Sequence, residues 1–110
     1  MTLTVTREHV QLLRHEKIEA FNAMAAKETP DLRNADLRGV DLRRADLRRA
    51  DLRGAYLRMA DLRGCDLSDA KLDSASIHRA RISGVLFPRD IRVQEIRLSL
   101  EYGTRMRADL

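Results

Sequence analysis

The chain has 110 residues, the size of one domain, and its 21 basic and 17 acidic side chains give a formal net charge of +4. Its single cysteine, Cys65, excludes an internal disulfide and a cysteine-based metal cluster. No apolar run approaches the roughly 20 residues that span a bilayer, and the N-terminus lacks a signal-peptide layout, so the sequence predicts a soluble, cytoplasmic protein.

Residues 1–29 have the pattern of a helical N-terminal cap, with Thr6 as its expected N-cap residue. Apolar residues recur at helical spacing at Val10, Leu13, Ile18, Phe21 and Met24. The stripe is irregular near Glu16, so it fits either one bent helix or two short ones. Pro30 stops the helix. We expect this segment to cover one end of the structure that follows, and the alternative is a helix that binds a partner.

Residues 30–89 repeat one five-residue phrase twelve times without a break, and its ideal form is Ala-Asp-Leu-Arg-Gly. The central position, called i, is large and apolar in every repeat. Position i−2 is a small or medium apolar residue in every repeat but the first, where it is Pro30. The central residues are Leu32, Leu37, Leu42, Leu47, Leu52, Leu57, Leu62, Leu67, Leu72, Ile77, Ile82 and Phe87.

The five-residue period excludes a simple helix and a flat strand. In an α-helix, residues five apart are separated by about 140°, so the leucines would point in all directions. In a strand the two faces alternate with period two, so an odd period would swap faces at each repeat. The period fits a chain that turns a corner every five residues, with i−2 and i pointing inward. Glycines then stand at the corners, at i+2: Gly39, Gly54, Gly64 and Gly84.

The unbroken A(D/N)LXX phrase resembles the repeat of the pentapeptide-repeat family, over 60 of the 110 residues. The resemblance implies an all-β solenoid, a right-handed quadrilateral β-helix in which four pentapeptides make one coil. Twelve repeats would give three coils about 4.8 Å apart, with columns of residues twenty apart. The twelve central residues would then form the core ladder, Phe87 would plug one end, and Cys65 would be buried among the alanines at i−2.

Residues 90–110 leave the repeat and are expected to cap the last coil. Helical spacing is kept by Val93, Ile96 and Leu100, and Gly103 follows where a helix C-cap would fall. The same stretch, residues 93–102, also alternates like a strand, and we favour the helix. The tail, residues 107–110, repeats Ala-Asp-Leu once, either by chance or because it docks on an exposed coil edge.

The sequence contains no catalytic, cofactor-binding or metal-binding constellation. The serines lack a motif, the three histidines are scattered over three segments, and no glycine-rich loop opens a helix to hold phosphate. We therefore expect a protein that is not an enzyme and that uses no cofactor.

Two outward surfaces are candidates for binding. In the first, Tyr56 and Met59 break the repeat at outward positions beside Arg38 and Arg58, which is the composition of an interface centre. The second is an arginine wall that suits a polyanion such as nucleic acid or an anionic surface. Its aspartates would neutralise it, and few aromatic residues accompany it, so nucleic acid is not favoured. The wall consists of Arg33, Arg43, Arg44, Arg48, Arg49, Arg53 and Arg63.

These features favour an interaction or assembly module that binds a protein partner or itself, as a dimer or end to end through open coil edges. The alternative function is binding of a polyanion. The resembled family is best known for members that mimic DNA and bind DNA gyrase, and that mimicry needs an acidic surface. Residues 30–89 carry thirteen basic against nine acidic side chains, so modulation of gyrase is the least favoured function.

Overall fold

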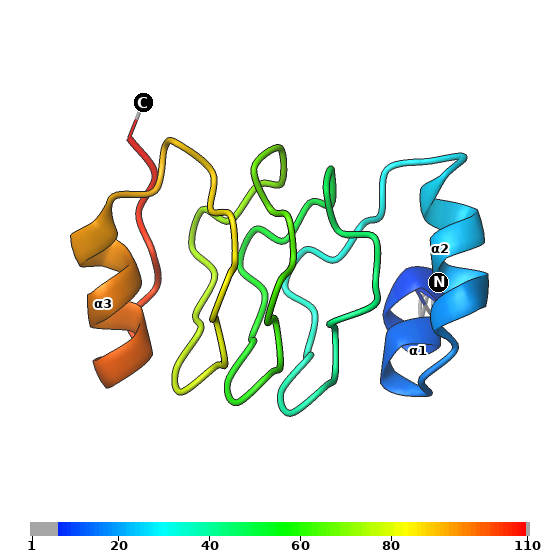
Figure 1. The fold of residues 1–110 in the computed structure, drawn as a ribbon, viewed down its shortest axis with the longest axis horizontal. Helices are drawn as coiled ribbons and strands as arrows, with labels where there is room; N and C mark the ends of the chain where they lie inside the picture. Colours follow the sequence, from blue (N-terminus) through cyan, green and yellow to red (C-terminus); the bar gives the residue numbers. More distant parts are fainter. Residues whose placement is uncertain (1–6, 110) are drawn as a thin grey trace, which may run out of the picture.

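A computed structural model of the protein describes residues 7–109, and residues 1–6 and 110 lie outside the described part. It contains helices α1 (Glu8–Arg14), α2 (Ile18–Ala25) and α3 (Val93–Tyr102). The repeats form a stack of turns between them, with α1 and α2 at one end and α3 at the other (Figure 1). The helices therefore lie where a repeat stack would otherwise expose its open ends.

Residues twenty apart in the repeat lie one above another. Parallel bridges join Asp31 to Asp51 and Asp51 to Lys71, and the Leu52 N–H donates to the Lys71 carbonyl at 2.9 Å. Four repeats therefore bring the chain back over itself. This offset divides the repeats into levels 1, 2 and 3, which are residues 30–49, 50–69 and 70–89.

The bridges are isolated, and no strand occurs within residues 7–109. Every repeat but the last bends at once, because the carbonyl of its central residue accepts a hydrogen bond from the N–H three residues later, as from Ala35 to Leu32 at 3.1 Å. The third residue of such a turn commonly has positive φ, as at Gly39 (φ 72°). The predicted all-β solenoid is thus met only in part: the pairing is parallel with the expected offset, but the sides are too short to form strands.

Ten of the twelve central residues are buried, so the core ladder forms along most of the stack. The exceptions are Ile82 and Phe87, which are only partly buried. Phe87 therefore packs against the core but does not close its end, contrary to the expectation from the sequence. Met106, which comes from the tail, is fully buried there instead, because the tail folds back beneath level 3.

Helices α1 and α2 supply hydrogen-bond partners to the edge of level 1 that faces away from level 2. The Asp31 N–H donates to His9 Nδ1 at 3.3 Å. The Asn22 side-chain amide makes two hydrogen bonds. Its Nδ2 donates to the Arg44 carbonyl at 3.0 Å, and its Oδ1 accepts from the Asp46 N–H at 2.7 Å. Side chains thus satisfy groups that a further level would otherwise pair.

The segment before the repeats forms two short helices rather than one bent helix. Glu16 lies between them with φ 60°, a left-handed conformation that an α-helix cannot continue. Thr6, the expected N-cap, lies outside the described residues, and Arg7 precedes α1 without a side-chain capping bond.

The C-terminal segment covers the edge of level 3 that faces away from level 2. Helix α3 confirms the favoured helix over residues 93–102, and Gly103 ends it with φ 74°. The Ile77 N–H donates to Ser99 Oγ at 2.9 Å. Beyond the helix, the Ser74 N–H donates to the Met106 carbonyl at 2.7 Å, so the tail takes the place of a fourth level.

The repeat-like tail docks on its own chain. Ala108 forms an antiparallel bridge with Ile91, and the Asp109 N–H donates to the Asp90 carbonyl at 2.7 Å. Its last residue, Leu110, lies outside the described part. The direction is antiparallel, so the tail does not continue the parallel register of the repeats.

The pairing of levels 1 and 2 is interrupted along residues 44–49. No bridge and no backbone hydrogen bond joins that described segment to residues 64–69, although Leu67 of level 2 donates to Leu86 of level 3 at 2.8 Å. Cys65 lies at this interruption, where its Sγ donates to the Leu42 carbonyl at 3.3 Å. Burial raises the pKa of the Cys65 thiol to about 11, so it is an inert, small apolar side chain at neutral pH.

Candidate protein-binding face

Ion pairs within single repeats neutralise most of the arginine wall. In Asp36–Arg38, the arginine Nε and Nη2 donate to the two carboxylate oxygens at 2.7 and 2.8 Å, and the Arg38 backbone N–H donates to the same carboxylate at 3.3 Å. Such bidentate pairing is the strongest geometry for this pair of groups. Six repeats contain it: Asp31–Arg33, Asp36–Arg38, Asp41–Arg43, Asp46–Arg48, Asp51–Arg53 and Asp61–Arg63.

The pairs lower the pKa values of the aspartates. The hydrogen bond from the Arg33 side chain lowers the pKa of Asp31 to about 2, and the bond from Arg43 does the same for Asp41. The Arg38 guanidinium holds the pKa of Asp36 well below its usual range. All of these carboxylates are therefore ionised at neutral pH.

These shifts predict an acid-sensitive fold. Because the folded-state pKa is below the value of about 3.9 in an unfolded chain, the stabilisation is complete above about pH 4 and is lost as the pH falls toward 2. We expect the free energy of unfolding, measured with urea, to fall between pH 5 and pH 2.5. Asp31→Asn should reduce that slope, and a wild-type free energy that does not change over this range would contradict the assignment.

Arg58 is the exception among the seven arginines at i+1 of residues 33–63. Tyr56 replaces the aspartate of its repeat, and no carboxylate of residues 7–109 forms an ion pair with Arg58. The Tyr56 hydroxyl instead accepts from Arg105 Nη2 at 2.7 Å, and the Arg105 guanidinium carbon lies 5.0 Å from the ring centroid. The tail thus uses Tyr56 as an anchor and leaves Arg58 uncompensated.

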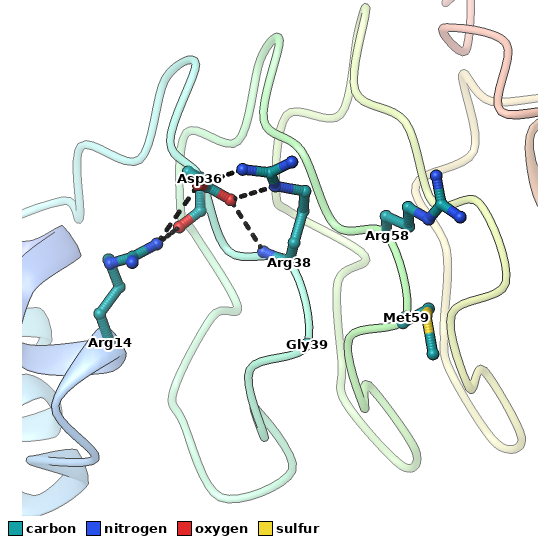
Figure 2. A pocket seen from close by; sticks show the side chains of 6 residues that line it. All are labelled: Arg14, Asp36, Arg38, Gly39, Arg58 and Met59. Atoms are coloured by element: carbon teal, nitrogen blue, oxygen red, sulfur yellow. Dashed lines mark hydrogen bonds and ion pairs between the residues drawn. The ribbon is translucent and has the colours of Figure 1, made fainter.

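A shallow hollow of about 620 Å³ lies beside Arg58, next to α1. Its only acidic lining residue, Asp36, is held from two sides: Arg38 binds it bidentately, and Arg14 of α1 lies 3.5 Å from its carboxylate. Figure 2 shows Arg14 and Arg38 directed at Asp36, while Arg58 points away from them above Met59. The hollow is therefore lined by three guanidinium groups and one carboxylate, and two of those guanidinium groups bind that carboxylate.

A second hollow, of about 390 Å³, continues the surface toward α3 and shares Arg38 and Arg58 with the first. Its lining contains cationic, hydroxyl and aromatic groups but no carboxylate. The lining residues are Arg38, Tyr56, Arg58, Ser76, His78, Tyr102 and Gly103. Together the two hollows form one basic and partly aromatic surface, called the Tyr56 face below.

Met59 has a conformation that its side chain does not favour. It stands at the turn position i+2, which is glycine in four repeats, with φ 59°, and its side chain is 59% exposed. Asn34, Ser74 and Arg79 have a similar positive φ at the same position of their repeats. A left-handed residue with a Cβ costs roughly 1–2 kcal/mol, and a Met59 side chain in solvent returns little packing energy. What distinguishes Met59 from these residues is a large apolar side chain in solvent, and strain combined with that exposure is grounds for a functional hypothesis.

The structure brings the four predicted interface residues, Arg38, Tyr56, Arg58 and Met59, onto one face. The wall residues Arg33, Arg43, Arg48, Arg53 and Arg63 are paired, whereas Arg44 and Arg49 have no ion pair among the described residues. Sequence reasoning missed His78, Arg14, Tyr102 and Arg105. His78 was discoverable, because it stands twenty residues after Arg58, but the others come from the caps and carry no repeat signal.

Comparison with known proteins identifies the repeat. The family model for pentapeptide repeats matches in 8 copies over residues 31–69 and 50–87, which together cover more than half of the chain. Curated proteins and solved structures gave no match. Among the described residues, no helix has the length and apolar character needed to cross a membrane. Pentapeptide repeats are found in repeat proteins of the kind that mediate protein interactions, and this chain belongs to the pentapeptide-repeat family.

Proposed function

We propose that the chain is a non-enzymatic protein-interaction module, a right-handed quadrilateral β-helix that binds a protein partner through its Tyr56 face. The twenty-residue offset of the bridges supports four pentapeptides per coil. The observation that carries the functional proposal is the repeat at residues 55–59. There, the substitution of Tyr56 for aspartate removes an ion pair, and Met59 adds backbone strain, yet neither side chain is buried. Tyr56 already anchors Arg105 of the tail, whereas the exposed Met59 and the unpaired Arg58 have no such use among the described residues. Contact with a partner gives them one.

The partner is a different protein rather than a second copy. End-to-end stacking needs open edges, and side chains of α1 and α2 and the tail occupy the outer edges of levels 1 and 3. Self-association through the Tyr56 face would bring Arg14, Arg38 and Arg58 of two copies together, with one aspartate on each side. Like charges brought together cost free energy and disfavour that arrangement.

The ion pairs between the wall arginines and their own aspartates also argue against binding of a polyanion. A nucleic acid binds through the release of counterions by many free cations, whereas five of the seven wall arginines already bind carboxylates of their own repeats. Binding to a polyanion would have to break those pairs or rely on Arg44 and Arg49. We therefore place protein binding first.

Site-specific cross-linking tests the proposed function. A photoreactive benzoylphenylalanine placed at position 59 should cross-link one protein in extracts of the source cells, and the same group at Arg48, an exposed paired residue in another column, should not. The protein identified by mass spectrometry is then purified and titrated against the wild-type chain and Met59→Gly.

We expect Met59→Gly to bind that partner at least fivefold more weakly while it is more stable than the wild type. Glycine relieves the left-handed strain but adds entropy to the unfolded chain, so the net gain in the free energy of unfolding should be roughly 0.5–1 kcal/mol. Equal binding by both chains, or identical cross-linked products from positions 59 and 48, would overturn the proposal.

A further inference from the structure

We infer that the partner segment bound by the Tyr56 face is acidic, and that Arg58 binds one of its carboxylates with the same two-pronged geometry that the other repeats use internally. This inference rests on the proposed function, because it names the chemistry of the partner at that same face.

The chain itself shows which ligand an arginine at this position takes. At six equivalent positions the guanidinium donates two hydrogen bonds to an aspartate, as Arg53 does to Asp51 at 2.9 and 2.6 Å. Arg58 occupies the equivalent position in its repeat but has no carboxylate from its own repeat, because Tyr56 stands there. An Asp or Glu side chain from another molecule can supply the group that the repeat lacks.

The surroundings of Arg58 favour an anion. The 390 Å³ hollow beside it contains no carboxylate. Arg38 in its lining is paired with Asp36, but Arg14 pairs with the same carboxylate, so this cluster keeps one net positive charge. Arg38 cannot itself bind the carboxylate bidentately, since its Nε and Nη2 already bind Asp36. A carboxylate placed here meets the free Arg58 guanidinium beside a cluster of net positive charge.

The flanking residues favour a peptide over a nucleic acid. Tyr56, Met59 and Tyr102 are 42%, 59% and 71% exposed, and they offer apolar contact on both sides of Arg58. A nucleic-acid backbone would need a row of free cations, but the neighbouring Arg38 and Arg53 are paired within their repeats. One free guanidinium between apolar side chains fits a single acidic residue in a mixed peptide segment.

Fluorescence anisotropy with a labelled deca-glutamate peptide tests the inference, with a ten-nucleotide oligothymidylate as the competing polyanion. We expect Arg58→Gln to weaken peptide binding about tenfold, the loss typical of a charge-assisted hydrogen bond. The matched control is Arg53→Gln, which removes the same charge at the same level and repeat position, but from a paired arginine. It should change the affinity less than twofold.

Two substitutions at Tyr56 test the reason that Arg58 is free. Tyr56→Asp restores the ideal repeat, so the new aspartate should pair with Arg58 and abolish peptide binding without unfolding the chain. Tyr56→Phe supplies no carboxylate and should keep most of the binding, although it loses the hydrogen bond to Arg105. Circular dichroism checks that both variants fold.

Equal losses from Arg53→Gln and Arg58→Gln would overturn the inference, because binding would then depend on net charge alone. Tighter binding of the oligothymidylate, or wild-type affinity in Tyr56→Asp, would also overturn it. If the partner cross-linked at position 59 binds Arg58→Gln as well as it binds the wild type, the carboxylate inference fails while the proposed function stands. Loss of position-specific cross-linking would remove the proposed function itself.

Discussion

Leu52→Arg is expected to unfold the chain at room temperature. Leu52 is fully buried in the central level, between the side chains of Leu32 and Leu72 in its column. Truncation of a buried leucine alone typically costs about 2–5 kcal/mol. An arginine adds a charge that has no buried partner, which costs several kcal/mol more, while typical domains have only about 5–15 kcal/mol of stability. Circular dichroism and a urea titration measure the loss directly.

Leu52→Met is the matched control, because it conserves volume and should cost less than about 1.5 kcal/mol. A second control, Arg53→Leu, changes the adjacent exposed residue and should leave the fold intact, since an exposed ion pair contributes only about 0–1 kcal/mol. A Leu52→Arg chain that melts at the wild-type temperature would show that Leu52 does not face a core.

Removal of residues 104–110 is expected to turn a chain of fixed mass into one that associates end to end. The deletion removes Met106, which is fully buried. It also leaves the Ser74 N–H and Ala75 carbonyl, which bond to Met106 at 2.7 and 2.9 Å, without partners. An exposed edge of unpaired backbone groups is a template for pairing with another chain. Light scattering should show a molar mass that rises with protein concentration.

The control for that deletion removes residues 109–110 only. This shorter cut keeps Met106 and its backbone bonds to Ser74 and Ala75, so it should keep the mass of the wild type. If the longer deletion leaves the mass unchanged at every concentration, the tail is not what protects the edge of level 3. If the chain without residues 104–110 stays soluble and monomeric, Met106 is not needed to cover the end of the core.

The repeat itself could be predicted from the sequence because a five-residue period fits only a chain that turns a corner at every repeat. A large apolar residue at every fifth position places Leu32, Leu52 and Leu72 in one column, and the bridges occur at that twenty-residue offset. The period could not predict where the stack ends, because that depends on chain outside the repeat. Phe87 is therefore only partly buried, while Met106, which has no repeat signal, completes the core.

The candidate site was predicted in composition but not in its contacts. Tyr56 and Met59 are visible in the sequence because they depart from the repeat, and Arg38 and Arg58 lie in the same column. The contact of Tyr56 with Arg105 joins residues 49 positions apart and depends on how the tail docks. That docking is set by α3 and the edge of level 3, so no local pattern reveals it, whereas the aspartate missing beside Arg58 is visible in the repeat itself.

The most direct test of the account is an NMR measurement of the arginine Nε–H groups, first alone and then with the glutamate peptide added. The bidentate pairs predict slow solvent exchange at the six paired arginines and fast exchange at Arg58. On addition of peptide, the Arg58 signal should shift and slow while those of Arg33 and Arg53 stay in place. Protection of Arg58 equal to that of its neighbours in the free protein, or shifts that begin at the paired arginines, would contradict the account.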